Sequence, residues 1–238
     1  MAAYEKWQEA ISQNISESSL PGFKKTEVAF SVLDSGSSGS DASNPDRVHT
    51  SMPSATPSID FAQGELSRSA NDLDFAIQGK GFFEVKEPNG QMAFTRDGEF
   101  HLSPQKTIVN SSGFPVQGDS GPITLNSGSG TVSINADGMI MQNDQPVAKL
   151  SAYDFTDPSQ LRRVGGGLLE PTDSAPTPKK MANPQIVNNY IESSNVSPMT
   201  EMVSLVSVSR AYEASQKVVQ TADDNQDKAI QMLGNTSS

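Results

Sequence analysis

The sequence contains no cysteine, so disulfide bonds and thiolate metal ligands are excluded. It contains only two histidines, His49 and His101, and two lone histidines make a poor metal site or catalytic triad. No Gly-x-Ser-x-Gly nucleophile elbow occurs either. We therefore expect a protein that is not an enzyme, with no catalytic residue, no metal site, no cofactor and no small-molecule substrate.

Long apolar runs are absent as well. Hydrophobic residues make up 34% of the chain, which is low for this length, so a single large core is not expected. No segment approaches the length of a transmembrane helix, and the first residues lack the apolar run of a signal peptide. We expect no membrane insertion, and any export should proceed without a cleavable signal peptide.

Positive charge is scarce. The chain has 17 Lys and Arg residues against 28 Asp and Glu residues, which gives a formal net charge of −11. A strongly acidic chain is repelled by phosphate backbones and by anionic lipid headgroups. This balance argues against nucleic acid or an anionic membrane surface as the partner.

The last third of the chain contains an apolar-periodic stretch from Met199 to about Leu233, with no Gly or Pro inside it. This pattern predicts one helix about 50 Å long, too long to be covered by a compact domain of this size. A heptad assignment places apolar residues on one narrow stripe. Because a narrow stripe on a long helix needs a second helix beside it, the chain is expected to assemble with others.

A shorter amphipathic helix is predicted for residues 3–18, ending before Pro21 and Gly22, which both break helices. We expect the first and last helices to lie near each other, because each presents one apolar stripe. Which contacts lie within a subunit and which lie between subunits is left open. The predicted partner-binding residues are Trp7, Ile11, Asn14, Ile15, Met202, Leu205, Val208, Tyr212 and Val219.

The centre of the chain alternates short apolar runs with turn dipeptides, which is typical of antiparallel hairpins. The fold class is therefore mixed and mainly β: a central all-β domain of short antiparallel strands, flanked by N- and C-terminal α-helices that pair as a coiled-coil-like layer. The predicted segments are an N-terminal helix and extended segment (1–33), a flexible Ser/Gly/Pro-rich linker (34–58), the all-β domain (59–185) and the long C-terminal helix (186–238). The predicted turns are Asn89-Gly90, Asp97-Gly98, Ser112-Gly113 and Asp137-Gly138.

Several motifs resemble those of the flagellar basal-body rod protein family of the FlgF/FlgG type. The first half of the chain contributes Ser12-Gln13-Asn14-Ile15 followed by Gly22-Phe23-Lys24, and a block from Asn71 to Val85. The block from Phe94 to Leu102 and that from Val109 to Gly118 resemble the next part of the family's β domain. Ser194-Asn195-Val196 and Arg210-Ala211-Tyr212-Glu213 resemble its C-terminal helix. Gly121-Pro122-Ile123 favours the FlgF-like, proximal-rod members.

The resemblance implies a structural role. Rod proteins of this family are exported unfolded without a cleaved signal and assemble in the periplasm as a helical tube, with their terminal helices inside. It implies that the chain belongs to the bacterial flagellar basal body and helps to transmit torque from motor to hook. The implied partners are other rod and hook proteins and further copies of the chain itself.

Two other classes of function remain as alternatives. An extracytoplasmic β-domain that binds a carbohydrate or peptide, with a dimerising coiled coil, would form a discrete dimer and bind its ligand with the ends removed. A hydrolase would act on an ester, peptide or glycan, since the partners of a pair of catalytic carboxylates are set by the fold.

Overall fold

The structure is a computed structural model that describes residues 2–34, 51–126, 131–135 and 137–234. Most of the predicted flexible linker, residues 35–50, lies outside the described residues. The chain divides into two compact units. Unit 1 comprises Met1–Ile15, Thr26–Ser58 and Ser197–Ser238, and unit 2 comprises Ser16–Lys25 and Ile59–Val196.

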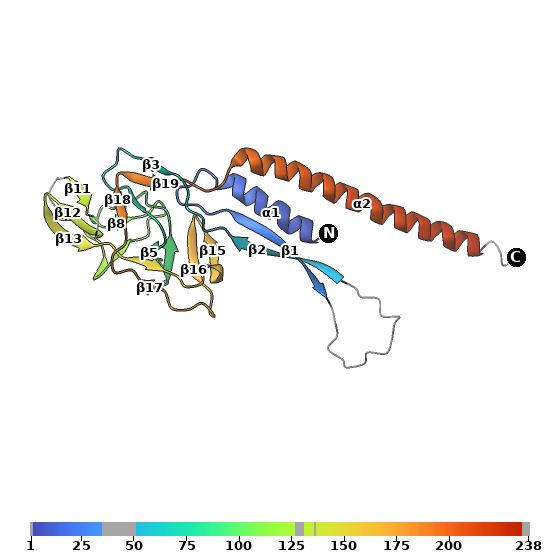
Figure 1. Cartoon of the computed structure of the whole chain (residues 1–238), viewed down its shortest axis with the longest axis horizontal. Coiled ribbons are helices and arrows are strands. Elements are labelled where there is room, and N and C mark those ends of the chain that lie inside the picture. Colours follow the sequence, from blue (N-terminus) through green and yellow to red (C-terminus); the bar gives the residue numbers. More distant parts are fainter. Residues whose placement is uncertain (1, 35–50, 127–130, 136, 235–238) are drawn as a thin grey trace. The chain divides into compact units, whose positions relative to one another are not determined.

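Unit 1 contains both helices and a two-stranded sheet (Figure 1). Its elements are α1 (Ala2–Ser16), β1 (Thr26–Asp34), β2 (Ser51–Ile59) and α2 (Pro198–Gly234). Helix α2 begins at a proline, which lacks the N–H that would go unpaired at that position anyway, and ends at a glycine. Its 37 residues correspond to a length of about 55 Å.

The two helices are in contact, because the Asn14 side chain on α1 donates a hydrogen bond to Glu201 on α2. The predicted fold class, mainly short antiparallel sheets with terminal helices that meet, is therefore confirmed. Helix α1 ends at Ser16, close to its predicted end at about residue 18. One local prediction was wrong, because residues 51–59 form strand β2 where the composition predicted a flexible linker.

Unit 2 is built from short strands and one 3-10 helix. Every strand pairing for which the register is described is antiparallel. The elements are β3 (Leu66–Arg68), β4 (Phe75–Ile77), β5 (Phe82–Lys86), β6 (Met92–Thr95), β7 (His101–Leu102), β8 (Ile108–Val109), β9 (Gln117–Gly118), β10 (Gly121–Pro122), β11 (Val132–Ile134), β12 (Met139–Gln142), β13 (Gln145–Lys149), β14 (Ala152–Asp154), η1 (Pro158–Gln160), β15 (Leu161–Gly165), β16 (Leu168–Pro171), β17 (Lys179–Lys180), β18 (Ile186–Asn188) and β19 (Tyr190–Glu192).

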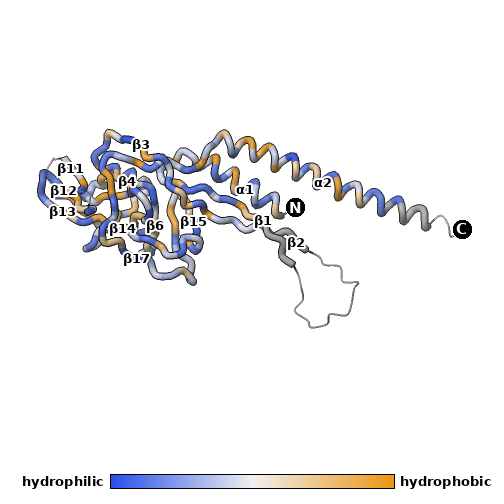
Figure 2. The backbone as a smooth tube through the Cα atoms, viewed as in Figure 1, coloured by the Kyte–Doolittle hydropathy of each residue, from blue (hydrophilic) through white to orange (hydrophobic). Residues whose placement is uncertain are grey.

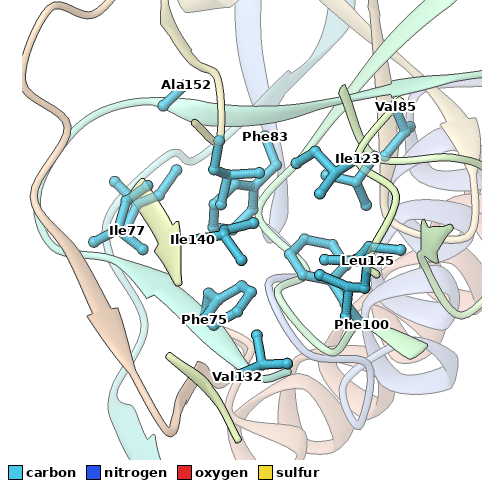
Figure 3. Close-up of a cluster of buried hydrophobic side chains, with 14 of the residues drawn as sticks. Phe75, Ile77, Phe83, Val85, Phe100, Ile123, Leu125, Val132, Ile140 and Ala152 are labelled. Atoms are coloured by element: carbon cyan, nitrogen blue, oxygen red, sulfur yellow. The ribbon is translucent and has the colours of Figure 1, made fainter. Parts of the chain in front are cut away.

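The main sheet of unit 2 has the strand order β15-β16-β6-β5-β14-β17 and is apolar on both faces. Neighbouring residues of a strand point to opposite faces, so the pair Phe82-Phe83 supplies one ring to each of two cores. The larger core gathers around Phe83, Phe75 and Phe100 (Figure 3), with the Phe83 and Phe100 ring centroids 5.2 Å apart. The smaller core contains Phe82, Phe94, Phe155, Leu161 and Leu169.

The C-terminal part of unit 2 differs from the predicted boundary. Residues 186–192, assigned from the sequence to the C-terminal helical segment, form strands β18 and β19, which pair with β4 and β3. The reason is local and steric: Pro198 disfavours a helix that would run through it from Ile186. The helix begins only where that proline becomes its first residue.

A carboxyl group buried in unit 2 leads to a pH-dependent stability. Burial raises the pKa of the Asp97 carboxyl from 3.8 to about 6, although hydrogen bonds from the Glu99 N–H and the Ser111 hydroxyl favour its charged form. The folded chain therefore holds this proton more tightly than the unfolded chain. The free energy of unfolding should fall by about 2–3 kcal/mol from this group as the pH rises from about 4 to about 6.

Asp97→Asn should remove this contribution while keeping both hydrogen bonds, since an amide oxygen accepts from Glu99 N and the amide nitrogen donates to Ser111. Urea unfolding at a series of pH values measures the difference between wild type and variant. Asp144→Asn, at an exposed turn, is the control and should leave the pH profile unchanged. Parallel profiles for wild type and Asp97→Asn would contradict the prediction.

Candidate interaction surface

Helix α2 has one covered face and one exposed face. Glu201 and Val208 are buried, and Leu205, Tyr212 and Ser215 on the same side are half-buried. These positions recur at the three- and four-residue spacing of a helix face. The face that they form is the one covered within unit 1.

The opposite face carries an exposed apolar stripe over the first turns of α2. Figure 2 shows hydrophobic residues recurring along this helix. Its members are spaced i, i+3, i+4 and i+7, so they lie side by side on the helix surface. They are Met199 (76% exposed), Met202 (50%), Val203 (67%) and Val206 (51%). We call these four residues the outer stripe.

The covered face becomes exposed further along the helix. Val219 continues the side of Val208 and Tyr212 but is 49% exposed, and its neighbour Val218 is 69% exposed. The distal half of α2 therefore presents apolar side chains on the side that is covered near its start. An apolar surface of this kind marks an interaction site more often than an ordinary surface does.

On the N-terminal side, Ile11 and Asn14 are buried within unit 1. Asn14 lies at the centre of a small polar junction: its Oδ1 accepts from the Thr26 N–H at 2.8 Å, and its Nδ2 donates to the Thr26 carbonyl at 2.9 Å. The same Nδ2 donates to Glu201 Oε2 at 3.1 Å. One asparagine thus joins α1, β1 and α2.

An aromatic pair holds the sheet of unit 1 against α1. The ring of Trp7 meets that of Phe30 on β1 edge-to-face, with centroids 5.1 Å apart. Phe30 is still 48% exposed. A groove of about 280 Å³ lies on the same unit, lined by Lys6, Glu9, Ala10, Gln13, Thr26 and Pro57.

The nine predicted partner-binding residues therefore divide into three groups. Ile11, Asn14 and Val208 are buried, so their contacts are made within this chain. Trp7, Ile15, Leu205 and Tyr212 are half-buried. Met202 and Val219 are exposed and available to a partner.

Sequence reasoning missed most of the outer stripe and also Phe30 and Glu201. The heptad assignment followed a 3.5-residue repeat and selected one side of α2. The spacing of Met199, Met202, Val203 and Val206 was a second signal, since it fits the 3.6-residue period of a single helix. Nothing in the sequence around Glu201 indicates that it is buried, because its burial depends on Asn14, which lies far away in the sequence.

Within the described residues, no helix combines the length and apolar character needed to cross a membrane. The described part of the chain also contains no group of three or more His, Cys, Asp or Glu side chains arranged to hold a metal ion.

Comparison with known proteins assigns the chain to a family. Residues 76–142 match the family described as flagellar hook protein FlgE/F/G D1 domain, and residues 187–232 match flagellar basal body rod FlgEFG protein C-terminal. The flagellar basal-body rod protein FlgF of Mesorhizobium japonicum is 30% identical over 236 residues, covering 99% of this chain and 95% of that protein. The chain belongs to the flagellar basal-body rod protein family. It is a structural protein of the rod and not an enzyme.

Other relatives carry both names found in this family. FlgF of Rhizobium meliloti is 31% identical over 234 residues, covering 98% of this chain and 93% of that protein. FlgG of Buchnera aphidicola subsp. Baizongia pistaciae is also 31% identical over 234 residues, covering 90% of this chain and 88% of that protein. The region matched by the rod C-terminal family runs from β18 into α2 and includes the outer stripe.

Proposed function

We propose that this rod-family chain is an axial subunit that assembles with further copies of itself and with other rod and hook proteins in a helical array. The array lies in the periplasm, the chain reaches it without a cleavable signal peptide, and it helps to transmit torque from motor to hook. Family membership supports the location in the rod. The acidic, cysteine-free composition is compatible with the proposed export into the periplasm.

The observation that carries the proposal is the outer stripe. Burying a valine or methionine side chain stabilises an interface by about 1.5–3 kcal/mol, and four such side chains lie side by side on α2. The occupant that we assign to them is the apolar face of a terminal helix from a neighbouring rod-family subunit. A contact between different faces of successive subunits builds a helical filament where the rotation between them does not close into a ring.

Val206→Asp should abolish rod assembly. A charge placed in an apolar contact costs several kcal/mol unless it is paired, whereas the same charge on the exposed stripe of an unassembled chain costs little. Cells that lack the gene and express the variant should show no hook or filament by electron microscopy. The purified variant should unfold at the same urea concentration as wild type.

Gln216→Asp is the matched control, because it adds the same charge to an exposed polar position on the same helix. It should restore flagella fully. Normal flagella in cells with Val206→Asp would refute the outer stripe as an assembly surface. A discrete dimer of the purified wild-type chain, together with normal flagella in the deletion strain, would favour the ligand-binding alternative.

A further inference from the structure

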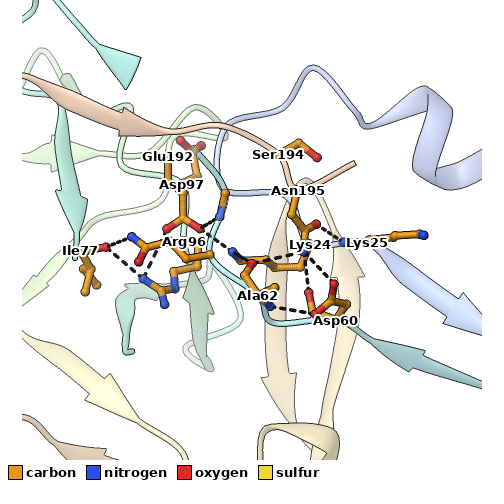
Figure 4. Close-up of polar contacts among 12 residues, drawn as sticks. Lys24, Lys25, Asp60, Ala62, Ile77, Arg96, Asp97, Glu192, Ser194 and Asn195 are labelled. Carbon is orange, nitrogen blue, oxygen red and sulfur yellow. Dashed lines mark hydrogen bonds and ion pairs between the residues drawn. The ribbon is translucent and has the colours of Figure 1, made fainter. Parts of the chain in front are cut away.

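The chain passes between the two units at four places. Three of these crossings adjoin the unit 2 residues 22–25, 60–64 and 192–195. Within unit 2 these segments are bound to one another (Figure 4). We call these three segments together the connection cluster. Connecting segments ordinarily run over the protein surface. The connection cluster differs because several of its hydrogen bonds and its ion pair are buried.

Asn195 joins all three segments. Its Oδ1 accepts from the Lys25 N–H at 2.7 Å, and its backbone N–H donates to the Phe23 carbonyl. Its Nδ2 donates to the carbonyls of Asp60 and Ala62 at 3.0 and 3.2 Å. One side chain thereby holds the segment before β1, the segment after β2 and the segment before α2.

A buried ion pair reinforces the same connection. Lys24 Nζ donates to Glu192 Oε1 and, at 2.7 Å, to the Ala62 carbonyl. Glu192 Oε1 also accepts from the Gly64 N–H at 2.9 Å, and Arg96 Nη1 lies 3.4 Å from Glu192 Oε2. Burial lowers the pKa of Lys24, and the Glu192 carboxylate opposes that shift.

Close backbone approach fixes the spacing of the segments. Gly22 has φ +67°, and a Cβ there would lie 2.3 Å from the carbonyl carbon of Arg96, which lies outside the three segments, so this glycine packs the first segment against the rest of unit 2. A Cβ on Gly64 would lie 1.9 Å from the Ser193 carbonyl oxygen. The segments therefore cannot separate or slide without breaking several contacts at once.

Strand β15 adds a fourth contact. Arg163 Nη2 donates to the Lys24 carbonyl, and the guanidinium lies 4.1 Å from the centroid of the Phe23 ring. Its neighbour Arg162 instead binds Glu170 on the adjacent strand β16. Two adjacent arginines of one strand thus serve different partners, and only one of them binds the connection cluster.

We propose that the connection cluster is a positioning device that holds its three segments at a fixed spacing where they lead into unit 1. Rod assembly needs this spacing in addition to the contribution of the cluster to the stability of unit 2. This inference rests on the proposed function. Each buried polar group that loses its partner costs free energy, so the hydrogen bonds of the cluster hold its backbone segments in place. A subunit under torque benefits when its connecting segments cannot move independently.

The test compares Asn195→Ala with Asn110→Ala. Asn110 is also an asparagine of unit 2 whose Oδ1 accepts backbone N–H groups, from Ser112 and Phe114, but it touches no connecting segment. Hydrogen exchange at the Lys25 amide should accelerate about tenfold in Asn195→Ala and remain unchanged in Asn110→Ala. Cells with Asn195→Ala should lose swimming, whereas cells with Asn110→Ala should swim, at a temperature where both chains are folded.

A second pair keeps the test decisive if Asn195→Ala does not fold. Arg163→Met should reduce swimming and Arg162→Met should not. Equal swimming within both pairs would overturn the positioning role. If Val206→Asp abolishes flagella while Asn195→Ala and Arg163→Met swim normally, the proposed function stands and this inference fails. If Val206→Asp also leaves flagella normal, the proposed function itself fails.

Discussion

Glu192→Leu is expected to lower the free energy of unfolding of unit 2 by about 3–5 kcal/mol, because it leaves buried cations without their counter-charge. The Glu192 side chain is fully buried, and it accepts hydrogen bonds from Lys24 and from the Gly64 N–H. The variant removes both of these bonds and brings nothing to replace them. Urea unfolding followed by far-UV circular dichroism measures the loss.

The double variant Lys24→Met/Glu192→Leu is the control for this prediction. The double variant also removes the Lys24 charge, so it should regain part of the stability lost in Glu192→Leu. Arg96, which lies 3.4 Å from Glu192 in the wild type, still lacks its counter-charge in this variant. The coupling energy between the two sites follows from the double-mutant cycle. A loss below about 1 kcal/mol in Glu192→Leu, or no recovery in the double variant, would show that the pair contributes little.

Local patterns predicted the strands of unit 2 well. Short apolar runs between turn dipeptides predicted short antiparallel strands, and the structure has them. The burial of both faces of the main sheet, through Phe82 and Phe83, was not predicted. Three of the four predicted turn glycines, Gly90, Gly113 and Gly138, have positive φ, at 89°, 82° and 81°. The short strands and these turns depend only on residues close together in sequence.

The fourth glycine shows where local reasoning ends. Gly98 was predicted as a positive-φ turn residue, yet it does not appear among the glycines of positive φ in the described chain. A Cβ at this position would lie 1.6 Å from the Phe75 carbonyl oxygen. The need for glycine arises from a strand that is 23 positions earlier in the chain, and no turn dipeptide encodes that approach.

Helix α2 shows the same division between local and tertiary information. Its extent was predictable because Pro198 and Gly234 bound a stretch free of helix breakers. The side of α2 that is covered was not predictable, because that side is set by the positions of α1 and β1. The heptad assignment consequently grouped Met202, which is half exposed, with the buried Val208.

The connection cluster lay beyond prediction from residue patterns. Lys24 and Glu192 are 168 positions apart, and each alone resembles an ordinary surface charge. Gly22-Phe23-Lys24 and Ser194-Asn195-Val196 were visible only as family motifs. The structure gives these motifs a shared physical reason, since Asn195 binds the backbone of Phe23 and of Lys25.

Asn14→Leu is expected to loosen unit 1 by about 3 kcal/mol, because three hydrogen bonds worth roughly 1 kcal/mol each are lost together. The side chain is fully buried, and Thr26 loses the partners of its N–H and its carbonyl in the variant. Local opening of α1 should then precede the unfolding of unit 2. Asn14 was predicted to bind a partner, so this variant separates an internal role from a surface role.

Trp7 makes that measurement specific, because it is the only tryptophan in the chain and its ring packs against Phe30 within unit 1. Tryptophan fluorescence should report a lower urea midpoint in Asn14→Leu, while circular dichroism of the β structure keeps the wild-type midpoint. Gln8→Leu, at an exposed position on the same helix, should move neither transition. A wild-type urea midpoint of Trp7 fluorescence in Asn14→Leu, together with a loss of assembly, would instead show that Asn14 contacts a partner. The junction of α1, β1 and α2 would then be held by apolar packing alone.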